Sequence, residues 1–383
     1  MCIRDRADVE QRNLQNNIVG LEASRLFARS EINMGVDAFR DSLYAMLKRN
    51  TFLNIKFENM LDTLGEMSRT DLYSYLKEWE QLTPLPFYSI GEPELTKVVN
   101  KGGEEFFVLK VLVSNNSDYD GIIQMNVLQN GWWYQPMEDP RARKKVEIAA
   151  HTSKEFVSVW EEQIRDVEIN TMVSGNLPYM IRQSIGNVKQ ERNKIVKDTI
   201  YTLPESSLEM PGEVIVDNED STLFVLSTPA VVGLLPKWLD KVEDTSFKYS
   251  GISWWRAPLQ WTATTNAKYY GKYIRSAYVI KSGDGSQTAT WKIPVPEAGQ
   301  YELYYHVFKD DELRWNDRLQ GEYHFRVAYD SEMEDAYINL RKANEGWEQL
   351  GTYYFSADTV RVVLTDECKL RSVTADAVKI VKR

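Results

Sequence analysis

The sequence predicts a multidomain, mainly β protein that begins with a short α-helical segment. Between residues 8 and 82, apolar residues recur every three or four positions, as in amphipathic helices. From residue 86 onward, short β-rich runs alternate with turn-forming residues. We therefore expect a helical segment at 1–84, an immunoglobulin-like β-sandwich at 85–190, a linker at 191–211 and a jelly-roll-like β-sandwich at 212–383.

The helical segment is expected to contain four helices. The first includes 18–27, the second spans 36–49, the third begins after Asn54, and the fourth follows the cap-forming stretch 68–71. Pro84 and Pro86 should end the segment, because proline cannot continue a helix.

The two sandwiches are predicted from β-rich runs. In the first, the runs are 106–113, 121–128, 145–149, 155–159 and 166–170. The segment 191–211 is polar and contains Pro204 and Pro211, which favours a linker. In the second sandwich, apolar residues alternate with polar ones over 289–295, 301–307 and 323–329, so Trp291 and Tyr301 should be core residues.

Composition excludes several classes of function. A net charge of -10 argues against a nucleic-acid-binding surface, and no apolar run is long enough to span a membrane. The only cysteines are Cys2 and Cys368, so we expect no disulfide framework. The three histidines (His151, His306 and His324) lack metal-site spacing, and the zinc motif His-Glu-x-x-His is absent. We expect no catalytic residues, metal site or cofactor in this chain.

The first six residues, Met-Cys-Ile-Arg-Asp-Arg, resemble translated sequencing-adapter sequence. We therefore expect the true N-terminus to lie upstream, so the lack of a signal peptide carries no information.

Two stretches resemble known families. The segments 37–43, 57–72 and 79–86 resemble the end of the catalytic domain of M1-type zinc aminopeptidases (gluzincins) and its exit into a β-domain. This resemblance implies that 1–84 is the helical remnant of a peptidase-like domain whose zinc ligands lie in a missing N-terminal part. With Gly20 aligned to the family's glycine, Asn17 stands where the family has a tyrosine.

The C-terminal part resembles the golvesin/xanthan-lyase-type carbohydrate-binding-like domain. The matching motifs occur in the same order as in that family: 213–220, Tyr269-Tyr-Gly271, 289–305, 347–355 and Ala375-Asp-Ala-Val378. This resemblance implies binding to carbohydrate or cell wall.

Ligand-binding candidates are the tryptophans outside the clear strands, because loop rings can stack on the apolar face of a sugar. These are Trp254, Trp255, Trp261 and Trp315. The acidic stretch 217–220 offers oxygen ligands for Ca²⁺, but it lacks EF-hand spacing, so a solvated turn is the preferred interpretation.

The first hypothesis is a non-catalytic C-terminal fragment of a secreted, periplasmic or extracellular bacterial protein of peptidase type. Its terminal sandwich would bind polysaccharide, cell wall or a protein surface. Two alternatives stay open: a scaffold from an inactive peptidase homologue that makes protein–protein contacts, and helices that complete a working zinc site with the missing part.

Overall fold

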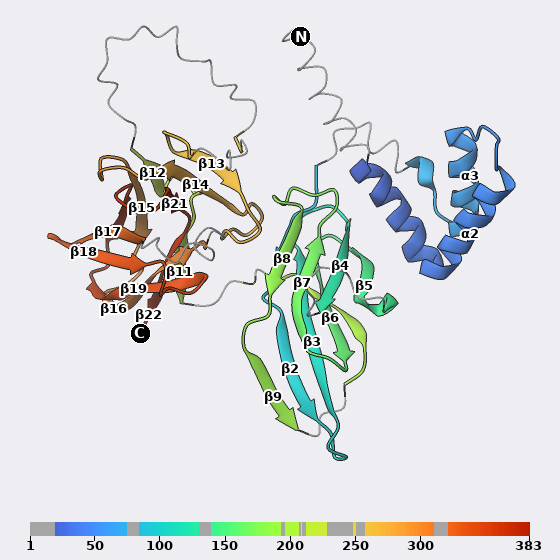
Figure 1. Cartoon of the computed structure of the whole chain (residues 1–383), viewed down its shortest axis with the longest axis horizontal. Coiled ribbons are helices and arrows are strands. Elements are labelled where there is room, and N and C mark those ends of the chain that lie inside the picture. Colours follow the sequence, from blue (N-terminus) through green and yellow to red (C-terminus); the bar gives the residue numbers. More distant parts are fainter. Residues whose placement is uncertain are drawn as a thin grey trace, which may run out of the picture. The chain divides into compact units, whose positions relative to one another are not determined.

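A computed structural model describes residues 20–74, 84–129, 139–192, 196–206, 208, 212–227, 248–249, 257–309 and 321–383. The chain forms two compact units, residues 1–208 and 209–383 (Figure 1). Most of the described elements are β-strands, so the predicted mainly β, multidomain class is confirmed.

The N-terminal unit begins with helices, as the apolar periodicity predicts. Residues 20–34 are helical, followed by α2 (Val36–Arg49), α3 (Phe57–Ser68) and a helical stretch at 72–74. The second predicted helix matches α2 at both ends. The apolar faces of the helices meet in a small core of Leu26, Met46, Leu61, Leu64 and Leu72.

These helices also contact the first sandwich. Ala28 of the first helical stretch packs with Ile122 and Met172. Beside this apolar contact, Glu31 pairs with Lys145 and Arg29 pairs with Glu147. The helices and the sandwich are therefore joined by both packing and ion pairs within one unit.

The first sandwich consists of two sheets. One has the order β10-β6-β3-β2-β9, with β1 also paired to β3. Its strands are β1 (Tyr88–Ile90), β2 (Glu94–Val99), β3 (Glu105–Asn115), β6 (Thr152–Trp160), β9 (Val188–Arg192) and β10 (Thr199–Pro204). The other has the order β5-β4-β7-β8 and consists of β4 (Gly121–Gln129), β5 (Arg143–Ile148), β7 (Ile164–Asn170) and β8 (Met180–Ser184). A short 3₁₀ helix, η1 (Pro140–Ala142), precedes β5.

The predicted linker at 191–211 requires a correction. It includes the end of β9 and all of β10, and β10 pairs antiparallel with β6 along its whole length. The side chains of β10 are mostly exposed, Ile200, Tyr201 and Leu203 among them, so the strand lacks the alternation of buried apolar and exposed polar residues that marks the other strands.

The described residues of the C-terminal unit form three sheets. Their strand orders are β11-β22-β16-β19, β12-β15-β20-β17-β18 and β13-β14-β21. The strands of the first are β11 (Glu213–Val216), β16 (Gly299–Val307), β19 (Gly346–Phe355) and β22 (Val378–Lys382). Those of the second are β12 (Phe224–Leu226), β15 (Thr288–Pro294), β17 (Glu322–Tyr329), β18 (Glu332–Asn339) and β20 (Thr359–Thr365). The third has β13 (Thr262–Thr265), β14 (Ser276–Lys281) and β21 (Ser372–Ala375).

One apolar core fills the C-terminal unit. The alternating runs of the sequence become β15, β16 and β17, each with one buried face. Trp291 and Tyr301 are both fully buried, which confirms them as core residues.

Candidate functional site

The outer face of the sheet β11-β22-β16-β19 carries a row of aromatic and polar side chains. In β16 the odd-numbered residues point into the core, so the even-numbered ones form the outer face. Strand register places Tyr304 opposite both Lys379 and Gln349, and His306 opposite Trp347. We call this surface the β16 face and define it as Glu213, Ile215, Gln300, Glu302, Tyr304, His306, Trp347, Gln349, Thr352, Tyr354, Lys379 and Val381.

Charges on the β16 face neutralise one another. Lys379 Nζ lies 2.8 Å from Glu213 Oε1, and it also lies 4.9 Å from the Trp347 ring centroid. Glu302 pairs with Arg383 at 3.3 Å and accepts a 2.6 Å hydrogen bond from the Tyr304 hydroxyl. This hydrogen bond raises the pKa of Tyr304, so the hydroxyl stays protonated and keeps donating.

Three of the family-like motifs meet at one end of this face. Asp376 is fully buried, and its Oδ2 lies 2.8 Å from His306 Nδ1. The backbone N–H of Tyr270 donates to both Asp376 carboxylate oxygens, at 3.2 and 3.1 Å. The rings of Tyr270, His306 and Trp347 lie together. Between ring centroids, Tyr270 and His306 are 5.8 Å apart, and each lies 5.1 Å from Trp347. Segments far apart in sequence thereby build one aromatic cluster around a buried carboxylate.

A second carboxyl lies near this buried acid. Asp217 follows β11 directly, and the pairing of Val216 with Val378 brings it toward Asp376. Burial raises the pKa of Asp217 well above its usual 3.8, and the charge of Asp376 raises it further. Burial also raises the pKa of Asp376, while His306 acts in the opposite direction. The acidic stretch is therefore not simply a solvated turn, because one of its carboxyls is held in a site that disfavours the charge.

We expect Asp217→Asn to stabilise the protein at neutral pH. A carboxyl whose pKa is raised by folding contributes its full stability below about pH 3.8, and this contribution is lost as the pH rises through the folded-state pKa. The amide keeps the carbonyl that accepts from the N–H of Asn218 and cannot ionise. Urea unfolding from pH 4 to 7 should show a gain that grows with pH.

Asp284→Asn is the matched control. Hydrogen bonds from Ser286 lower the pKa of the Asp284 carboxyl. Replacing this carboxyl with an amide should therefore not increase the free energy of unfolding at pH 7. An Asp217→Asn protein less stable than the parent at pH 7 would contradict the assignment.

The four predicted ligand-binding tryptophans do not gather into a site that the structure describes. Trp254, Trp255 and Trp315 lie outside the described residues. Trp261 is half-buried and packs against the core of the C-terminal unit, and its indole N–H has no hydrogen-bond partner among the described residues. Sequence reasoning passed over the outward residues of β16 and β19, although the alternation that identified the core face also defines the opposite face.

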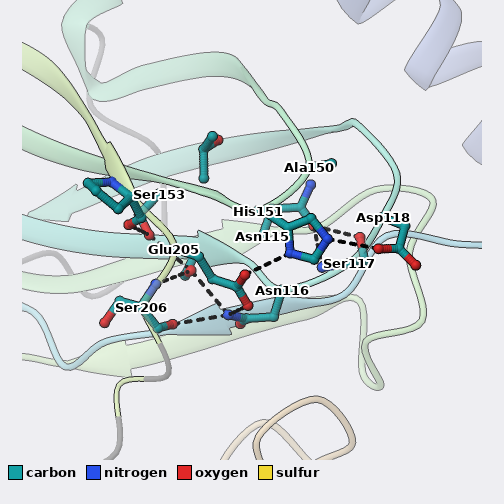
Figure 2. Close-up of polar contacts among 12 residues, drawn as sticks. Asn115, Asn116, Ser117, Asp118, Ala150, His151, Ser153, Glu205 and Ser206 are labelled. Carbon is teal, nitrogen blue, oxygen red and sulfur yellow. Dashed lines mark hydrogen bonds and ion pairs between the residues drawn. The ribbon is translucent and has the colours of Figure 1, made fainter.

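Each histidine lies beside carboxylates. In the N-terminal unit, Figure 2 shows His151 between two acids, with Nδ1 2.7 Å from Glu205 and Nε2 2.8 Å from Asp118. These two hydrogen bonds, the one to Asp118 first, raise the pKa of His151. His324 likewise bonds Asp335 at 2.8 Å.

The residues around His151 tie loops together. The side-chain amide of Asn116 donates to Glu205 at 2.8 Å and to the Ser206 carbonyl at 3.0 Å. The network fastens the end of β10 to the loop after β3 (Figure 2).

Zinc does not fit the described part of the chain. No group of three or more His, Cys, Asp or Glu side chains there could hold a metal ion. Each histidine instead lies in a separate place and bonds a carboxylate. No helix among these residues is long and apolar enough to cross a membrane.

Two solved structures show a distant likeness to this chain. A xanthan lyase from Paenibacillus is 18% identical, with 79% of this chain and 27% of that chain covered and a TM-score of 0.32. A β-glucuronidase from Bacteroides uniformis is 11% identical, with 83% and 32% covered and a TM-score of 0.22. The chain thus spans about a third or less of these proteins, and TM-scores this low carry no argument about function. No curated protein sequence matches the chain.

A family match covers part of the C-terminal unit. Residues 254–382 match the golvesin C-terminal domain. The matched range includes Tyr270 and Trp347 of the aromatic cluster and the buried Asp376. The C-terminal unit of this chain therefore contains a golvesin-type domain.

Proposed function

We propose that the C-terminal unit is a non-catalytic binding module for a polysaccharide or cell-wall surface, and that the β16 face is its ligand-binding surface. The observation that carries this proposal is the row of side chains along β19. Gln349, Thr352 and Tyr354 are all exposed and lie on the same side of the strand, and Tyr354 has 60% of its surface exposed. Gln300 lies opposite Tyr354 on β16.

The chemistry of this row fits a hydroxyl-rich chain. Amide and hydroxyl groups both donate and accept hydrogen bonds, as sugar hydroxyls do. An exposed tyrosine ring offers a flat apolar surface with a polar tip, which suits the C–H face of a sugar. Because Lys379 and Glu302 already have partners of opposite charge, the face presents no free charge and favours a neutral ligand.

Pull-down of the full chain on insoluble neutral glucan and on wall sacculi tests the proposal. We expect Tyr354→Ala and Gln349→Ala to weaken binding without changing the melting temperature, because both side chains are exposed. A stacked ring contributes about 1 kcal/mol, so the Tyr354 change should weaken binding roughly fivefold. Tyr201→Ala, an exposed ring in the N-terminal unit, is the matched control.

The predicted loop residues belong to the same experiment. Trp254→Ala, Trp255→Ala and Trp315→Ala should also weaken binding if these rings extend the surface. Failure of the unmutated chain to bind any polysaccharide would reject the proposal and favour the protein-scaffold alternative. The proposal would also be rejected if the substitutions weakened binding only when they lowered the melting temperature.

We also propose that this module belongs to a larger secreted bacterial protein, periplasmic or extracellular, whose helical segment ends a peptidase-like domain. Support comes from the motif resemblance and from exposed apolar side chains on this segment, including Tyr44, Phe52, Leu53 and Phe57. A peptidase-like domain packed on this segment would cover them. His-Glu-x-x-His in the upstream reading frame would indicate a zinc enzyme, and its absence would indicate a scaffold.

A further inference from the structure

The outer face of the second sheet differs in charge from the β16 face. In β20, Thr359, Arg361 and Val363 point outward, and in β17 His324 and Arg326 do so. Lys292 on β15 lies directly opposite Arg361. We call this surface the β20 face and define it as Thr290, Lys292, His324, Arg326, Ala328, Met333, Asp335, Tyr337, Arg361 and Val363.

Three cations gather at the centre of this face. Lys292 and Arg361 are directly opposite across two strands, and the Cβ atoms of such a pair lie about 5 Å apart. Arg326 is the diagonal neighbour of Arg361 on the next strand, and residues in that relation lie about 7–8 Å apart. Like charges placed directly opposite destabilise a sheet, so this arrangement is unfavourable unless an anion lies between them.

None of the three cations has a counter-ion within the described residues. Asp335 lies opposite Arg326 in the strand register, but its carboxylate bonds His324 at 2.8 Å instead. The Nε of Arg326 is buried and has no hydrogen-bond partner in the part of the chain that the structure describes. A buried guanidinium nitrogen without an acceptor is costly, and a bound anion would supply the acceptor.

A flat ring lies beside the cations. Tyr337 is 56% exposed, and it stacks on His324 with ring centroids 4.9 Å apart and planes 9° from parallel. The stacking holds the tyrosine ring in one orientation with its other surface free for a ligand. Cations and a fixed ring therefore lie side by side on one sheet surface.

We infer that the β20 face binds a polysaccharide that carries carboxylates, such as a polyuronate. The guanidinium groups of Arg326 and Arg361 match a carboxylate in shape and charge, and Tyr337 matches a sugar ring. A nucleic acid fits less well, because three cations are few and the whole chain has a net charge of -10. The inference rests on the proposed polysaccharide-binding role for its ligand class, but it concerns a different surface.

Binding of the full chain to polygalacturonate, measured by affinity electrophoresis, tests the inference. We expect the double variant Lys292→Gln/Arg361→Gln to weaken binding at least tenfold, and Arg326→Gln to weaken it several-fold. Added NaCl should weaken binding of the parent more than that of the double variant, because fewer counterions are displaced when two cations are missing.

Lys342→Gln/Lys369→Gln is the matched control. Both lysines are exposed and lie outside the β20 face, and the two substitutions remove the same charge as those in the test variant. It should leave binding within about twofold of the parent. Equal losses in the two double variants would overturn the inference and indicate a general charge effect. Binding of duplex DNA as tightly as polygalacturonate would overturn the ligand class.

The two proposed surfaces fail separately. Retained binding to neutral glucan without binding to polygalacturonate would reject the β20 face alone. Binding to polygalacturonate that depends on Arg326 and Arg361, without any binding to neutral glucan, would reject the β16 face alone.

Discussion

Replacing Trp291 with alanine is expected to lower the free energy of unfolding of the C-terminal unit by about 3–5 kcal/mol. Trp291 has no exposed surface. Its ring contacts Phe224 at 5.3 Å and Tyr305 at 6.1 Å between centroids. Its indole N–H donates to the backbone carbonyl of Asp376 at 3.1 Å. The substitution removes this packing and leaves that buried carbonyl without the donor.

Hydrogen exchange of the full chain gives a readout that is specific to this unit. Amides of β15 and β20 should exchange faster in the variant, while those of β3 and β6 in the N-terminal unit should keep the parent rates. Tyr354→Ala is the control, because its exposed ring should change stability by less than about 0.5 kcal/mol. A loss below about 1 kcal/mol for Trp291→Ala would contradict its place in the core.

Gly271→Ala is expected to have the second largest effect, a loss of about 2–5 kcal/mol when backbone strain and overpacking are combined. Gly271 has φ +150°, a backbone conformation that residues other than glycine rarely adopt. A Cβ there would lie 1.9 Å from the carbonyl oxygen of Ile274, so the backbone must shift. The shift would move Tyr270, whose N–H donates to the buried Asp376.

Gly346→Ala separates strain from the steric clash. Gly346 also has a positive φ, +97°, but a Cβ there would meet nothing within 4 Å. We expect it to lose only about 1–2 kcal/mol, from backbone strain alone. Urea unfolding of both variants should therefore give clearly different midpoints, and equal losses would show that the contact with Ile274 is unimportant.

The C-terminal core could be predicted from the sequence because antiparallel strands alternate. Apolar residues at every second position of 289–295 and 301–307 must face one side, which identified Trp291 and Tyr301 as buried. The helix α2 was equally predictable, because its apolar residues recur at helical spacing. The strand β10 was not, because its apolar residues at 200, 201 and 203 do not alternate with polar ones and Pro204 at its end favours a linker.

The two proposed surfaces depend on tertiary structure. Alternation shows that Tyr304 and Arg326 point outward, but not which strands lie beside them. Only the strand order and register place Lys379 next to Tyr304 and Lys292 next to Arg361. The same holds for Asp376, a single acid in the motif at 375–378, which becomes a buried partner of His306 only when β16 pairs with β22. The residue pattern alone thus determined which residues form the core, while non-local strand pairing decided which polar residues meet, because contacts between paired strands, such as that of Lys379 with Glu213, join residues 166 positions apart in the chain.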